Sequence, residues 1–99
     1  MAFISWTEQA QEDLESIAEY ISKDSEKYAS AQLNRFLDAV SIPENHPEFG
    51  KPVPEFKHSE IRELLVGSYR IIYRIVDFNI IHILTIHHSR RLLPGNLFE

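Results

Sequence analysis

The run from Ile61 to His88 constrains the fold most, because it is almost continuously apolar and rich in β-branched and aromatic residues. Such residues favour strands over helices. Two short breaks interrupt the run, Gly67-Ser68 and Asp77-Phe78-Asn79, and both have the residue types of tight turns. The pattern therefore predicts three consecutive antiparallel strands.

Strict alternation of side chains predicts which residues share a face of the sheet. One face of the middle strand is expected to carry Tyr69, Ile71, Tyr73 and Ile75, and the other Arg70, Ile72, Arg74 and Val76. In the last strand, alternation places His82 and His88 on one face and His87 on the other. We expect the face of Arg70 and Arg74 to be exposed and free for a partner, because burying two unpaired guanidinium groups would be costly.

Two amphipathic helices are predicted ahead of this sheet. Apolar residues recur at helical spacing over residues 8–23 and again to about residue 42, with Thr7 and Ser25 as expected N-caps. Residues 3–6 form a short apolar strand that is expected at a sheet edge. Four of the five prolines fall between Pro43 and His58, where neither a helix nor a central strand is expected.

The order strand-helix-helix-strand-strand-strand predicts an α+β fold, in which an antiparallel sheet packs on a helical hairpin. The length of 99 residues predicts a single domain spanning residues 1–99. No apolar stretch approaches the ~20 residues that a membrane span needs. The first residues also lack the pattern of a signal peptide, so a cytoplasmic protein is expected.

Charge is distributed unevenly along the chain, which has a formal net charge of −5. Residues 1–55 carry four Lys or Arg and eleven Asp or Glu, whereas residues 56–98 carry six and three. The net charge argues against a general nucleic-acid binder. The absence of cysteine excludes disulfides, thiolate nucleophiles and cysteine-based metal sites.

The histidines do not predict a metal site. His87 and His88 are adjacent on a strand and should point to opposite faces, while His82 and His88 would be ~20 Å apart at 3.3 Å per residue. No cofactor is predicted either. An imidazole titrates near neutral pH, so either His87 or His88 could act as a general acid or base, or could cap the end of its strand.

Several local motifs, taken in order, carry a resemblance to a known family. The first helix has Ala10-x-x-x-Leu14-x-x-Ile17 and Tyr20-Ile21, and the connection has Phe49-Gly50-Lys51-Pro52-Val53-Pro54-Glu55. The strands follow with Ile61-Arg62-Glu63-Leu64, Tyr69-Arg70-Ile71-Ile72-Tyr73 and Ile86-His87-His88-Ser89-Arg90-Arg91. Over essentially its whole length the chain resembles toxins of the RelE/ParE superfamily, from bacterial type II toxin-antitoxin modules, which are often labelled plasmid stabilisation proteins.

The resemblance implies one of two activities. RelE-like members cleave mRNA at the ribosome, and this pattern would assign catalysis to Arg70 with His87 or His88, and would match a loop glutamate to Glu55. ParE-like members inhibit DNA gyrase and lack the nuclease residues. The strand at Ile61 to Leu65 lacks the lysines of the RelE type, the expected terminal tyrosine is absent, and the closing histidine and arginine pattern resembles the ParE branch.

The resemblance therefore favours a ParE-like toxin without enzymatic activity, which inhibits growth through DNA gyrase and is neutralised by a cognate antitoxin. The alternatives are a ribosome-dependent mRNA endoribonuclease and a degenerate member that only binds its antitoxin. A dimer or a toxin-antitoxin hetero-oligomer is possible. The expected partner-binding residues are Arg62, Arg70, Arg74, Arg90, Arg91, Leu92 and Leu93.

Structural roles compete with these functional ones. Arg70 and Arg74 could form surface ion pairs with Glu60 or Glu63, and Arg62 could pair with Glu63 to protect an edge strand. The apolar residues of the tail could pack on the sheet, or could join a groove that holds an extended segment of the antitoxin.

Overall fold

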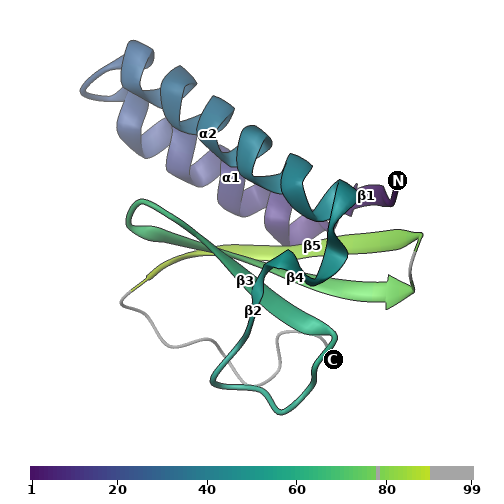
Figure 1. Ribbon diagram of the computed structural model, residues 1–99. Coiled ribbons are helices and arrows are strands. Elements are labelled where there is room, and N and C mark those ends of the chain that lie inside the picture. The colour runs from purple at the N-terminus through teal and green to yellow at the C-terminus, as the bar shows by residue number, and fades with distance from the viewer. Residues whose placement is uncertain (78, 90–99) are drawn as a thin grey trace.

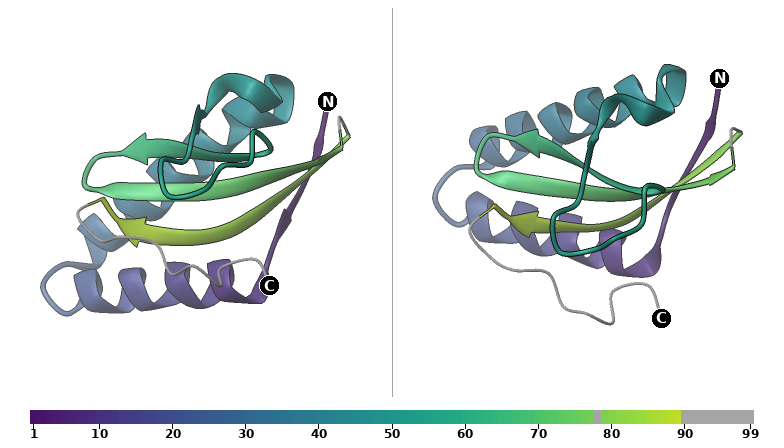
Figure 2. Two further views of the ribbon diagram at one scale, coloured as in Figure 1. Left: turned by 90° about the horizontal axis from the view of Figure 1, so that it is seen from below. Right: turned by 60° about the horizontal axis from the view of Figure 1, so that its bottom comes forward.

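The computed structural model describes residues 1–77 and 79–89. Its elements in chain order are β1 (Phe3–Trp6), α1 (Glu8–Ser22), α2 (Glu26–Asn45), the 3₁₀ helix η1 (Pro47–Phe49), β2 (Lys51–Pro52), β3 (Ile61–Val66), β4 (Tyr69–Asp77) and β5 (Ile80–His88). The two helices lie side by side on one face of the sheet, and the connection from β2 to β3 passes over the opposite face (Figures 1 and 2). The predicted α+β fold with a helical hairpin is confirmed.

The sheet has the strand order β1-β5-β4-β3-β2. β3, β4 and β5 form the predicted antiparallel meander, and β2 adds antiparallel to β3. β1 lies at the expected edge and runs parallel to β5. The turn between β3 and β4 is tight because Gly67 takes a left-handed backbone with φ of 60°.

Local capping explains where the two helices begin. The Thr7 hydroxyl oxygen accepts a hydrogen bond from the Ala10 N–H at 3.2 Å, and the Ser25 hydroxyl oxygen accepts one from the Tyr28 N–H at 3.1 Å. Both predicted N-caps are therefore confirmed. Thr7 also donates to the carbonyl of Ile83 at 2.8 Å, so the same residue attaches the start of α1 to β5.

Apolar clusters cover both faces of the sheet. The larger cluster lies beneath the helices and includes Phe36, Ile71, Tyr73 and Ile83. A smaller cluster on the opposite face consists of Val53, Ile61, Ile72 and Leu84, with Phe56 packed against it. The prediction that this second face is free for a partner is wrong at its centre, because the connection from β2 to β3 supplies apolar side chains that cover it.

A β-bulge in β5 changes the side-chain alternation that the sequence predicts. Ile72 lies opposite Thr85 and Tyr73 opposite Ile83, so Leu84 is the extra residue. After the bulge, Ile86 joins the cluster beneath the helices instead of following Leu84 onto the other face. The predicted faces of β5 are therefore correct through Leu84 and wrong beyond it.

The second helix also ends later than expected. α2 continues through Pro43 to Asn45, although the sequence prediction ended it near residue 42. The buried ring of Pro43 removes one backbone donor, but the turn still closes with a 2.9 Å hydrogen bond from the His46 N–H to the Ile42 carbonyl. The Glu44 carbonyl accepts from the Ala2 N–H at 2.7 Å, so the N-terminal segment secures this end of the helix.

Within residues 1–77 and 79–89, no helix combines the length and the apolar composition that crossing a membrane requires.

Candidate functional site

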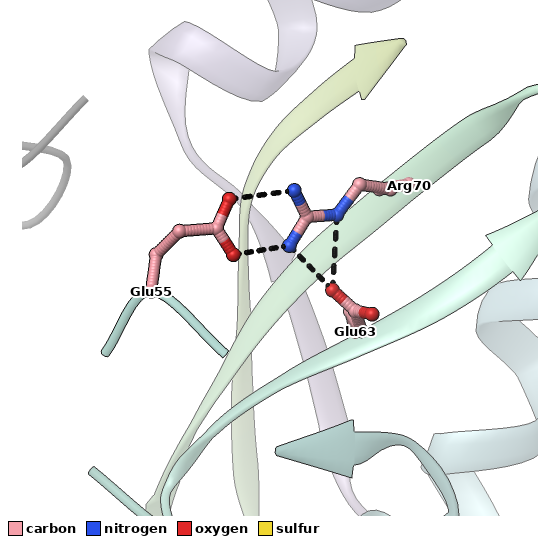
Figure 3. A network of polar contacts seen from close by, with 3 residues as sticks. All are labelled: Glu55, Glu63 and Arg70. Carbon is pink, nitrogen blue, oxygen red and sulfur yellow. Dashed lines mark hydrogen bonds and ion pairs between the residues drawn. The ribbon is translucent and has the colours of Figure 1, made fainter. Parts of the chain in front are cut away.

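Arg70 lies at the centre of a three-residue network on the sheet face opposite the helices (Figure 3). β4 supplies Arg70, β3 supplies Glu63, and the connection that follows β2 supplies Glu55. The two Nη atoms of Arg70 each donate to one carboxylate oxygen of Glu55 at 2.8 Å. On its other side, Nε and Nη2 donate to Oε2 of Glu63 at 3.0 and 2.6 Å.

The network is buried, and it carries more negative than positive charge. Only 6% of Arg70 and 9% of Glu63 is exposed to solvent. The hydrogen bonds that the guanidinium donates to Glu55 have the largest effect on its pKa. Together with the interaction with Glu63, they raise the pKa of Arg70 above its ordinary value despite the opposing effect of burial. Because one cation lies between two carboxylates, the network is better suited to a structural role than to binding a further anion.

The expectation that Arg70 is exposed is therefore wrong. It assumed an unpaired guanidinium, whereas Arg70 is buried because two carboxylates compensate its desolvation. Arg70 does form the predicted ion pair with Glu63, but the pair is buried instead of lying on the surface, and Glu55 also pairs with Arg70. Arg74 is exposed as expected and lies opposite Ile61 and His82 in the sheet.

Arg62 does not pair with Glu63, because successive residues of a strand point to opposite faces. Its guanidinium instead donates to three backbone carbonyls, those of Ser59 at 3.1 Å, Glu48 at 3.1 Å and Gly50 at 2.9 Å. Arg62 thereby holds to β3 both the residues just before β2 and the residues just before β3. The expected partner-binding residues Arg90, Arg91, Leu92 and Leu93 lie outside the described residues.

The two candidate histidines occupy different environments at the end of β5. His87 lies directly opposite Arg70 in the register, and His88 lies opposite Tyr69. The ring centroids of His88 and Tyr69 are 5.9 Å apart in an edge-to-face arrangement. The register therefore brings His87 next to the network of Arg70 and Glu55, whereas His88 is on the side of the helices.

Both histidines line a cavity of about 500 Å³ beside α1. Its other lining residues are Asp13, Ser16, Ile17, Tyr20, Tyr69 and Ile86. Asp13 already accepts a hydrogen bond from the Ile86 N–H at 3.0 Å and one from the Thr85 hydroxyl. These bonds occupy the edge of β5 at residues that β1 does not reach. In the part of the chain that the structure describes, no group of three or more His, Asp or Glu side chains is placed to hold a metal ion.

Tyr73 forms a second polar contact that the sequence reasoning missed. Its hydroxyl donates to the Pro47 carbonyl at 2.7 Å and accepts from the Gly50 N–H at 2.8 Å. Burial raises the pKa of the Tyr73 phenol. A Cβ at Gly50 would lie 2.6 Å from the same hydroxyl, so this close approach requires glycine. The Phe49-Gly50-Lys51-Pro52 motif is the sequence signal that could have indicated it.

This arrangement of sheet and helical hairpin is shared with chains from solved toxin-antitoxin systems. A chain of the chromosomal ParDE toxin-antitoxin system from P. aeruginosa matches with a TM-score of 0.73 and 22% identity, over 91% of this chain and 98% of that one. A chain of the RelBE2 toxin-antitoxin complex from Mycobacterium tuberculosis matches with a TM-score of 0.56 and 23% identity, over 88% and 96%. At these identities the likeness shows a shared fold.

The family itself is shown by the sequence. The model of the ParE toxin of the type II toxin-antitoxin system parDE matches residues 4–93. The chain therefore belongs to the ParE toxin family, as the motifs predicted. A search of curated proteins finds no match.

Proposed function

We propose that this ParE-family toxin inhibits growth by acting on DNA gyrase in the cytoplasm, and that a cognate antitoxin binds and neutralises it. The choice of gyrase as the target rests on the burial and pairing of Arg70, the residue to which the nuclease pattern would assign catalysis. Its guanidinium is buried, and it makes four hydrogen bonds to two carboxylates.

A nuclease needs donors that are directed at the charge that develops on the scissile phosphate. A phosphate that approached Arg70 would have to displace Glu55 or Glu63, and it would meet their excess negative charge. The strand that contains Glu63 supplies no lysine to offset this charge. These features favour a protein target over RNA cleavage.

A second candidate function is a ribosome-dependent mRNA endonuclease, and one observation favours it. Glu55, Arg70 and His87, which come from separate segments, are brought to the same region of the sheet. In that role, Arg70 would stabilise the phosphorane, and the carboxylate and the imidazole would transfer protons. Glu63 favours the gyrase target over the nuclease, because it already accepts a hydrogen bond from Arg70 Nε and a phosphate would have to displace it there.

Two parallel assays with the purified chain test the proposal. The first measures supercoiling of a relaxed plasmid by gyrase, and the second maps cuts in a translated mRNA by primer extension. We expect inhibited supercoiling or trapped cleavage complexes, and no cuts at codon positions. His87→Ala should leave the inhibition intact, as should the matched variant His46→Ala at the exposed end of α2.

Codon-position cuts that His87→Ala abolishes and His46→Ala retains would reject the gyrase proposal in favour of the nuclease. The absence of both activities would reject both and support a member that only binds its antitoxin. Co-expression with the product of a neighbouring small reading frame tests neutralisation, since growth should recover and the two proteins should purify together.

A further inference from the structure

Polar side chains form a row across three strands at the end of the sheet where β1 joins β5 (Figure 1). Arg74 of β4 lies opposite His82 of β5, and His82 lies opposite Ser5 of β1. The strand neighbours of these residues belong to the cluster beneath the helices or pack against it: Tyr73, Ile75, Ile81, Ile83, Ile4 and Trp6. Alternation therefore directs the row to the face opposite the helices. The Cβ atoms of an antiparallel pair are about 5 Å apart, so one ligand group can contact Arg74 and His82 together.

Apolar surface adjoins this row at the edge of the sheet. Phe3 of β1 lies opposite Ile80 of β5, two residues before Ser5 and His82 on their strands, so both share the face of the row. Phe3 is 69% exposed. The connection from β2 to β3 covers the centre of this face, whereas Phe3 and Arg74 remain exposed. Phe3, Ser5, Arg74, Ile80 and His82 are together called the Arg74 surface.

Arg74 differs from the other two arginines of the described strands. Arg62 donates to three backbone carbonyls, and Arg70 is held between two carboxylates. Within residues 1–77 and 79–89, no Asp or Glu forms an ion pair with the exposed guanidinium of Arg74. Arginine and aromatic side chains are the types that contribute most to protein interfaces. An exposed guanidinium beside an exposed Phe3 therefore suits a carboxylate that a partner presents next to an apolar side chain.

The charges select a protein as the partner. A nucleic acid needs several cations to neutralise its phosphates, whereas this surface supplies one arginine in a chain of net charge −5. A two-fold pairing of two copies through this surface would bring their Arg74 side chains together, which like charge disfavours. A segment of another protein with acidic side chains beside an apolar one meets neither obstacle.

We propose that the Arg74 surface is the contact through which the toxin holds its target, by binding a segment that presents a carboxylate next to an aromatic or aliphatic side chain. The carboxylate would accept hydrogen bonds from the Arg74 guanidinium, and the His82 imidazole and Ser5 hydroxyl would supply further ones. The apolar side chain would pack on Phe3 and Ile80. The inference rests on the proposed function, in which gyrase is the target that supplies this segment.

Charge reversal at Arg74 tests the surface in the supercoiling assay. Arg74→Glu should raise the toxin concentration that gives half-inhibition about tenfold, and Phe3→Ser should also raise it. Arg74→Lys keeps the charge without the planar fork, so its effect should be smaller. The matched control Lys27→Glu reverses a charge at the exposed start of α2 and should inhibit like the parent chain. Circular dichroism melts verify folding, and Arg74→Ala provides the test if Arg74→Glu does not fold.

A pair of short peptides tests the carboxylate preference without gyrase. The probe is acetyl-Leu-Glu-Phe-Glu-amide, and its neutral control has glutamine in place of both glutamates. Each is titrated into the full isotope-labelled chain and followed by NMR. We expect the acidic peptide to shift the amides of Ser5, Arg74 and His82, and to bind about tenfold more tightly than the neutral one at low salt. Arg74→Glu should remove this preference, and high salt should reduce it, because the guanidinium is solvent-exposed.

Equal binding of the two peptides, shifts confined to other residues, or a dimer in sedimentation that Arg74→Glu abolishes would overturn the inference. The two assays also separate its failure from failure of the proposed function. If the parent chain and Arg74→Glu inhibit gyrase equally, only the Arg74 surface is refuted. If the parent chain leaves gyrase active but binds the acidic peptide through Arg74, only the proposed target is refuted. A parent chain that neither inhibits gyrase nor prefers the acidic peptide refutes both.

Discussion

Replacement of Arg70 by alanine tests whether the buried network holds the connection onto the sheet. The change removes four hydrogen bonds and leaves two carboxylates without a cation, one of them on Glu63, which is only 9% exposed. Breaking a buried ion pair in this way costs about 3–5 kcal/mol. For a domain of this size, 1 kcal/mol shifts the melting temperature by about 4–8 °C, so we expect a fall of at least ~12 °C.

Urea denaturation and thermal melts followed by circular dichroism measure this effect. The matched control is Arg74→Ala, which removes an exposed guanidinium from the same strand and should change stability by about 0.5 kcal/mol or less. A triple variant that adds Glu55→Gln and Glu63→Gln to Arg70→Ala should regain part of the lost stability, because the two carboxylates that had no cation are then neutral amides. Equal effects of the Arg70 and Arg74 variants, or no recovery in the triple variant, would refute the reasoning.

Three further variants examine the other contacts that position the connection and the first helix. Tyr73→Phe leaves the Gly50 N–H and the Pro47 carbonyl without their buried partner and should cost about 1–3 kcal/mol in urea denaturation. Because the pKa of Tyr73 is raised in the folded state, the protonated phenol favours folding. The parent chain should therefore lose stability as pH rises above about 10, and the Tyr73→Phe variant should not show this pH-dependent loss. Gly50→Ala should lower the melting temperature, because its Cβ would lie 2.6 Å from the Tyr73 hydroxyl. Thr7→Ala removes the N-cap bond to Ala10 and should destabilise by about 0.5–2 kcal/mol, measured by chemical denaturation.

Exposed residues of the same types provide the controls. Tyr20→Phe and Ser30→Ala each alter a solvent-exposed position and should stay within about 0.5 kcal/mol of the parent chain. A Tyr73→Phe variant as stable as Tyr20→Phe would contradict the role of the buried hydroxyl. An unchanged melting temperature in Gly50→Ala would show that the chain can move away from Tyr73, and a stable Thr7→Ala would mean that the cap is dispensable.

The candidate site was only partly predictable. The sequence identified Arg70 and Glu63 as one possible pair, and the family resemblance added Glu55 and His87. It could not decide whether these residues meet, because they come from a loop and three strands that only the folded sheet brings together. The sequence therefore suggested an exposed cation where the structure has a buried and neutralised one.

The sequence by itself determined the helical hairpin, its caps at Thr7 and Ser25, and the meander of three strands, because periodicity, capping and turn residues act over a few neighbouring positions. The tertiary structure decided the bulge at Leu84, the extension of α2 through Pro43 and the burial of Arg70. Each of these depends on partners distant in sequence: β4 opposite Leu84, the Ala2 N–H that bonds near the end of α2, and the carboxylates around Arg70. Local patterns specify elements, whereas the energy of a buried charge or an irregular strand depends on what the rest of the fold places beside it.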